Sequence, residues 1–97
     1  MNIYNHTLPS IGEEFTTLLE SKNIKIVKIV SSDNINDIEY CQNENEFVVL
    51  IEGSATIEIE GDIKKLKRGD YLYIPALKKH KVIKTSKGTL WIAIHFK

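Results

Sequence analysis

Short runs of isoleucine and valine, each ended by turn-forming residues, are the feature that most restricts what this chain can fold into. β-branched side chains favour strands, and the glycines, aspartates and asparagines between the runs favour turns. The turn signals are Glu52-Gly53, Glu60-Gly61-Asp62, Arg68-Gly69-Asp70, Pro75-Ala76 and Lys87-Gly88. The pattern therefore predicts β structure over most of the chain.

About eight short strands follow from this punctuation. Residues 24–30 largely alternate, which predicts a half-buried strand, and residues 31–37 form a polar loop. The other strands are expected near 38–42, 46–51, 54–60, 63–67, 71–74, 80–85 and 89–96. Short strands at close spacing indicate a sandwich or a closed barrel. With 97 residues the chain can build only one core, so we expect a single domain over 1–97, with its barrel at about 24–96.

One helix is expected before the barrel, at about residues 11–21. Ser10 and Glu13 have the spacing of a capping box, which marks the start of a helix. Ile11, Phe15, Leu18 and Leu19 follow at spacings of four, three and one, which would place them on one helical face.

The composition of the chain bears on its binding partners and on its location in the cell. The formal net charge is zero, so we expect neither nucleic acid nor a membrane as a partner. Most lysines nevertheless follow residue 62, which leaves open a regulatory or scaffold domain acting through the basic second half. Cys41 is the only cysteine, so there is no internal disulfide, and a cytoplasmic location fits. The first residues do not resemble a signal peptide, and the longest apolar run, 47–51, is far too short to span a bilayer.

Two stretches carry a more specific signal. The first runs from Tyr40 to Glu46 and is followed by Gly53, and the second runs from Gly69 through Pro75 to His80. Together they resemble the two motifs of the cupin superfamily, and the resemblance spans roughly residues 34–96. It implies an all-β jelly-roll barrel, in agreement with the strands expected from the turns.

The resemblance also implies a metal site inside the barrel. In cupins the first motif usually supplies two histidines and a glutamate, and the second supplies a third histidine. The glutamate falls on Glu46 and the last histidine on His80, while Tyr40 and Gln42 replace the other two histidines. We read this Tyr-x-Gln-x-x-x-Glu motif as a variant metal site with Gln42, Glu46 and His80 as ligands. A mixed nitrogen and oxygen set suits Mn, Fe, Ni, Zn or Cu, and no organic cofactor is implied.

The residues themselves support an interior site. Positions 40 and 42 share one face of a strand, so Tyr40 would point into the cavity together with Gln42. Glu46 opens an apolar run, where a carboxylate is rarely buried unless it is paired or coordinating; a salt bridge at the strand end is the alternative. Trp91 and His95 share a face of the last strand and are expected to line the pocket. Two alternatives stay open: Tyr40 as a packing residue, and His95 as a hydrogen-bonded residue at the edge of the sheet.

The sequence leaves more than one function open. The leading hypothesis is a pocket that binds a divalent metal and a small organic ligand, and the resemblance implies oxygenase- or isomerase-type chemistry if the protein is catalytic. The alternative is a metal-free module that binds a sugar or metabolite through hydrogen bonds. A homodimer is expected because so small a barrel would leave apolar outer side chains uncovered.

Overall fold

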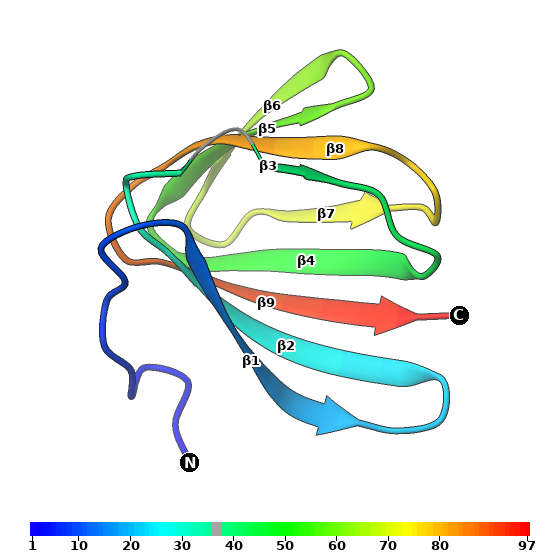
Figure 1. Ribbon diagram of the computed structural model, residues 1–97, viewed down its shortest axis with the longest axis horizontal. Helices are drawn as coiled ribbons and strands as arrows, with labels where there is room; N and C mark the ends of the chain where they lie inside the picture. The colour runs from blue at the N-terminus through cyan, green and yellow to red at the C-terminus, as the bar shows by residue number, and fades with distance from the viewer. Residues whose placement is uncertain (36–37) are drawn as a thin grey trace.

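The computed structural model describes residues 1–35 and 38–97, which form nine strands and no helix (Figure 1). The strands are β1 (Glu13–Glu20), β2 (Ile24–Ser31), β3 (Ile38–Tyr40), β4 (Asn45–Glu52), β5 (Ser54–Ile59), β6 (Asp62–Lys67), β7 (Tyr71–Ile74), β8 (His80–Thr85) and β9 (Thr89–Phe96). Within these residues, no element meets the length and hydrophobicity of a membrane-crossing helix.

The strands form two antiparallel sheets that enclose the interior. The five-stranded sheet has the order β1-β2-β9-β4-β7, and the four-stranded sheet has the order β3-β8-β5-β6. In Figure 1 the four-stranded sheet lies above the five-stranded one. The architecture is the predicted all-β jelly roll, and every strand predicted from residue 24 onward is present.

The predicted helix at 11–21 is wrong, because most of this segment is the edge strand β1. It pairs with β2 from Glu13 opposite Ser31 to Glu20 opposite Lys25. The register shifts between Thr17 and Leu19, so one extra residue enters the strand. That extra residue gives the apolar side chains of β1 a helix-like spacing in the sequence. In the structure, Phe15 and its apolar neighbours are about half exposed, so they do not form the buried face of a helix.

The apolar core lies between the sheets. Its buried members are Val48, Leu50, Ala55, Ile57, Ile59, Ile74, Trp91 and Ala93, from β4, β5, β7 and β9. Gly53 turns the chain between β4 and β5 with a φ of 96°, and a Cβ there would lie 2.6 Å from the Thr89 hydroxyl. Only glycine fits both the backbone angle and the close approach.

The register of the five-stranded sheet places polar residues at both ends of its inner face. Glu13 lies opposite Ser31 in one row. At the far end, His95 lies between Lys25 on β2 and Glu46 on β4. The rows between are mainly apolar, so the interior has an apolar middle with a polar group of side chains at each end.

Candidate functional site

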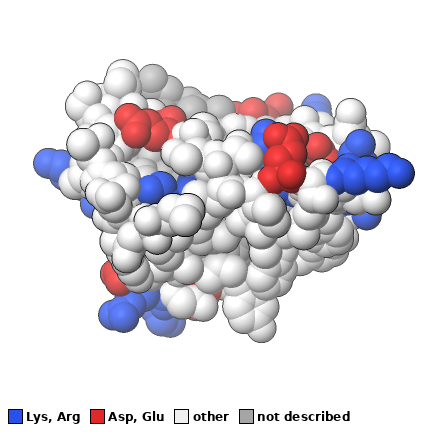
Figure 2. Space-filling model, turned by 90° about the horizontal axis from the view of Figure 1, so that it is seen from below, with Lys and Arg blue, Asp and Glu red and all other residues white. Residues whose placement is uncertain are grey.

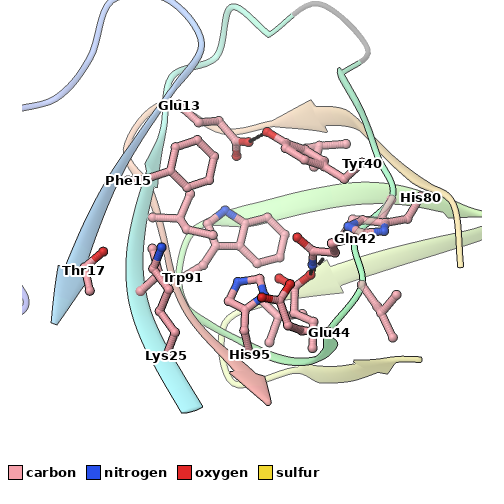
Figure 3. Close-up of a pocket in the computed structure, with 17 residues that line it drawn as sticks. Glu13, Phe15, Thr17, Lys25, Tyr40, Gln42, Glu44, His80, Trp91 and His95 are labelled. Carbon is pink, nitrogen blue, oxygen red and sulfur yellow. Dashed lines mark hydrogen bonds and ion pairs between the residues drawn. The ribbon is translucent and has the colours of Figure 1, made fainter. Parts of the chain in front are cut away.

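A cavity of about 290 Å³ lies between the sheets, at the low end of the size range for small-molecule sites. Its polar lining residues are Glu13, Thr17, Lys25, Tyr40, Gln42, Glu44, Glu46, His80 and His95. All six residues selected from the sequence line it: Tyr40, Gln42, Glu46, His80, Trp91 and His95 (Figure 3). Cys41, between Tyr40 and Gln42, is exposed instead.

Glu46, at the second position of β4, lies against the cavity with an exposed fraction of only 7%. Its Oε1 accepts a hydrogen bond from the Gln42 amide at 2.6 Å. Its Oε2 accepts no hydrogen bond from any residue that the structure describes. Burial raises the pKa of Glu46 to about 7, which outweighs the opposing effect of Gln42, and the negative charge of Glu13 adds to the rise.

His80 begins β8 and faces Glu46, with its Nε2 3.6 Å from the Glu46 Oε1. Its Nδ1 lies 3.3 Å from the Lys78 carbonyl oxygen, which can only accept, so Nδ1 carries the proton. The lone pair of Nε2 is therefore the one directed toward Glu46. Burial lowers the pKa of His80, and the ring is neutral at neutral pH.

His95 lies beside Glu46 on the neighbouring strand β9. Burial is the main cause that lowers the pKa of His95, with smaller electrostatic contributions from Lys25 and, where its ring is protonated, from His80. Glu44 acts in the opposite direction. Both imidazoles of the cavity are thus neutral at neutral pH.

The opposite end of the cavity is built around Glu13 on β1. Its Oε1 accepts from the Tyr40 hydroxyl at 2.9 Å, and its Oε2 accepts from the Ser31 hydroxyl. The Ser31 oxygen in turn accepts from the indole N–H of Trp91 at 2.9 Å. Burial raises the pKa of Tyr40, and the charge of Glu13 raises it further, so the phenol keeps its proton. This network fixes the Glu13 carboxylate between the two sheets.

Sequence reasoning missed several lining residues. Glu13, Phe15 and Thr17 come from β1, where a helix was expected. Their spacing of two was the available signal, because alternate residues of a strand share one face. Lys25 and Glu44 also line the cavity, and Glu44 follows Gln42 at the same spacing of two.

The predicted metal ligands Gln42, Glu46 and His80 come together, but the donors do not fit a tightly held metal. Within residues 1–35 and 38–97, no three histidines, cysteines, aspartates or glutamates lie close enough to hold one. Gln42 directs its N–H toward Glu46, which leaves one imidazole and one carboxylate as strong donors. Tightly bound transition metals usually have at least three protein ligands, so we derive no chemistry through a metal.

Two antiparallel sheets wrapped around a polar-lined cavity define the jelly-roll class of small-molecule-binding barrels. Sequence comparison identifies the family within this class. The family model described as "Cupin domain" matches residues 38–95, so the chain belongs to the cupin family. No curated protein matches the chain.

Solved structures agree with this assignment. A Ralstonia eutropha JMP134 protein described as a "putative mannose-6-phosphate isomerase" is 33% identical, with 100% of this chain and 96% of that one covered and a TM-score of 0.88. An RmlC-like cupin from Shewanella frigidimarina NCIMB 400 is 19% identical over 96% and 85% of the two chains, with a TM-score of 0.80. KdgF from a Halomonas species is 14% identical over 96% and 89%, with a TM-score of 0.81. The last two show the shared fold alone.

Proposed function

We propose that this cupin binds a small polar organic molecule in its barrel and moves a proton on it through Glu46, in an isomerase-type reaction. The observation that carries the proposal is the Glu46 Oε2. It belongs to a buried side chain that lines the cavity and accepts no hydrogen bond from the described residues, none of which has a fully buried polar side-chain atom without a partner, so this oxygen is open to a ligand. A ligand N–H, O–H or acidic C–H is the partner it lacks.

The protonation states of Glu46 and His80 suit proton transfer. A carboxyl with a pKa of about 7 is present in both forms at neutral pH, so it can accept a proton and return it. In the proposed step on a hydroxyaldehyde or hydroxyketone, the Glu46 carboxylate takes the proton from the hydroxyl-bearing carbon next to the carbonyl, which leaves an enolate. The hydroxyl proton passes to the former carbonyl oxygen, and the resulting carboxyl group of Glu46 returns its proton to the former carbonyl carbon, so that the carbonyl and the hydroxyl exchange places. The neutral His80 Nε2, 3.6 Å from the Glu46 Oε1, accepts a hydrogen bond from a ligand hydroxyl. The name of the Ralstonia relative supports the isomerase class.

The test is deuterium exchange in heavy water, followed by NMR at the carbon next to the carbonyl, across a panel of small hydroxyaldehydes and hydroxyketones. We expect exchange to rise as pH increases through about 7, and to fall roughly a hundredfold or more in Glu46→Gln. Glu39→Gln is the matched control, because this glutamate of β3 is exposed and lies outside the cavity lining. Binding without exchange, or exchange independent of Glu46, would leave a binding module and overturn the catalytic role.

A weakly held divalent metal is the second candidate. It is supported by the convergence of Gln42, Glu46 and His80, and by the lone pair of the His80 Nε2 toward Glu46. Metal analysis of untagged protein tests it, with Mn, Fe, Ni, Zn and Cu measured together. Gln42→His should raise affinity, because it adds an imidazole; no metal in either protein would reject this candidate.

We propose that the protein also forms a homodimer through the outer face of its five-stranded sheet. Tyr71 and Tyr73 on β7 are 67% and 52% exposed, and they stack on Phe47 and Phe96 at centroid distances of 5.5 and 6.3 Å. In the view from below in Figure 2, uncharged atoms cover much of the surface, with clusters of acidic and basic residues among them. Light scattering should give twice the chain mass for the wild-type protein and the monomer mass for Tyr71→Lys. A monomeric wild type at micromolar concentration would refute the dimer.

A further inference from the structure

The charge of the cavity indicates which kind of small molecule it accepts. Among the described lining residues, Glu13 and Glu44 are acidic besides Glu46, against the single ammonium of Lys25. An anionic ligand would therefore meet mostly like charge, whereas a cation would meet opposite charge in a partly desolvated space.

Aromatic rings gather at the Glu13 end of this cavity. Phe15 and Tyr40 meet edge to face with centroids 6.4 Å apart at 70°, and Trp91 is linked to Glu13 through Ser31. Figure 3 shows Phe15 and Trp91 on one side of the Glu13 carboxylate and Tyr40 on the other. The faces of such rings attract cations, with Trp the strongest of the three. Glu13 uses its two hydroxyl contacts for orientation and retains further lone pairs for a ligand.

We propose that the ligand is a small organic cation, bearing a protonated or alkylated amine whose nitrogen lies between Glu13 and the rings of Phe15, Tyr40 and Trp91. This inference rests on the proposed small-molecule function and specifies its ligand class. The Glu46 carboxyl group, which lines the other end of the cavity, accepts from an N–H or O–H of the same molecule. The same charges disfavour a sugar phosphate, because Lys25 is the only lysine or arginine in the described lining.

Calorimetry with one sugar skeleton in three charge states tests the proposal. The probes are glucosamine, glucose and glucose 6-phosphate, followed by choline and its uncharged carbon analogue 3,3-dimethylbutan-1-ol. A charge-assisted contact should make each cation bind roughly tenfold to hundredfold more tightly than its neutral counterpart. Zinc alone is titrated as well, because a bare metal cation would respond to the same carboxylates.

Two variants and one control locate the binding. Glu13→Gln keeps the shape and removes the charge, so it should abolish the preference for the cation. Phe15→Leu removes a half-exposed ring that the fold does not need, and it should weaken the cations while sparing the neutral probes. Glu14→Gln is the control: it lies on the same strand, is exposed, and lies outside the cavity lining. Thermal melts confirm that each variant is folded.

The outcomes separate this inference from the function on which it rests. Equal binding of glucose and glucosamine, or tighter binding of glucose 6-phosphate, would overturn the cation inference and leave small-molecule binding in place. A cation preference that survives Glu13→Gln and Phe15→Leu would overturn the assigned site. Tight binding of zinc with no binding of either amine would replace the organic cation with a metal. If no organic probe binds at 10 mM-scale concentrations (roughly the weak limit of specific binding), both proposals fail.

Discussion

Glu13 and Glu46 lie at opposite ends of the same cavity and have very different surroundings. Both oxygens of Glu13 accept from hydroxyl groups, and one of those hydroxyls accepts in turn from an indole N–H. Glu46 has one amide donor on one oxygen and none, among the described residues, on the other. Burial accordingly raises the pKa of Glu46 to about 7.

The difference shows how burial and hydrogen-bond donors together decide what a carboxyl group can do. Donors that remain in place stabilise the charged form, whereas burial without enough donors favours the protonated form. Glu46 is thereby suited to exchange a proton, whereas Glu13, which is less buried, is held in place by its two hydroxyl donors. Glu13 also joins β1 and β3, the edge strands of different sheets, through its contact with Tyr40.

The largest expected effect comes from replacing Glu46 with glutamine. Raising the pKa of this carboxyl from 4.5 to about 7 favours its protonated form in the folded protein by about 3 kcal/mol. The folded state therefore loses stability as pH rises from about 4.5 to 7, and the full penalty applies above 7. Glu46→Gln removes the penalty and should raise the free energy of unfolding by up to about 3 kcal/mol at pH 8, with little gain at pH 4.

Chemical denaturation at pH 4, 6 and 8 measures this effect. The exposed Glu14→Gln serves as the control and should show no such dependence on pH. A gain in Glu46→Gln that is the same at pH 4 and pH 8 would point to packing rather than charge, and the contrast between the two carboxylates would lose its basis.

The sequence predicts one end of the cavity far better than the other. Glu46, His80 and Gln42 stand in motifs with fixed spacing. The spacing of two between Tyr40 and Gln42 predicted that both line the cavity, as they do, although β3 ends at Tyr40. The strands from residue 24 onward were also predictable, because β-branched runs and turn residues are local signals.

The Glu13 end depends on contacts that no local pattern records. Glu13 meets Ser31 and Tyr40, which are 18 and 27 residues away along the chain. The irregularity after Thr17 gives β1 a helix-like spacing of apolar residues, so the strand itself was misassigned. Tertiary pairing with β2 overrides that local pattern.

An intermediate effect is expected from Ser31→Ala. The Ser31 side chain is fully buried, accepts from the Trp91 N–H and donates to Glu13, so alanine leaves a buried donor and a carboxylate oxygen unpaired. The free energy of unfolding should fall by about 2 kcal/mol. The exposed Ser54→Ala is the control and should stay within about 0.5 kcal/mol of the wild type. Equal losses in both variants would mean that the Glu13 network contributes nothing measurable.

The smallest expected effect on stability comes from removing the contact between the two edge strands β1 and β3. Tyr40→Phe keeps the ring that stacks on His80 and removes only the hydroxyl that donates to Glu13. It should cost about 1 kcal/mol of unfolding free energy, because the site is partly open to water. Tyr73→Phe is the matched control, since its hydroxyl donates to Asn45 at an exposed position and should matter little.

The double variant with Glu13→Gln should lose less than the sum of the two single losses, because both remove the same contact. Strictly additive losses would instead show that Tyr40 and Glu13 act independently, and that the Glu13 carboxylate is held by Ser31 alone.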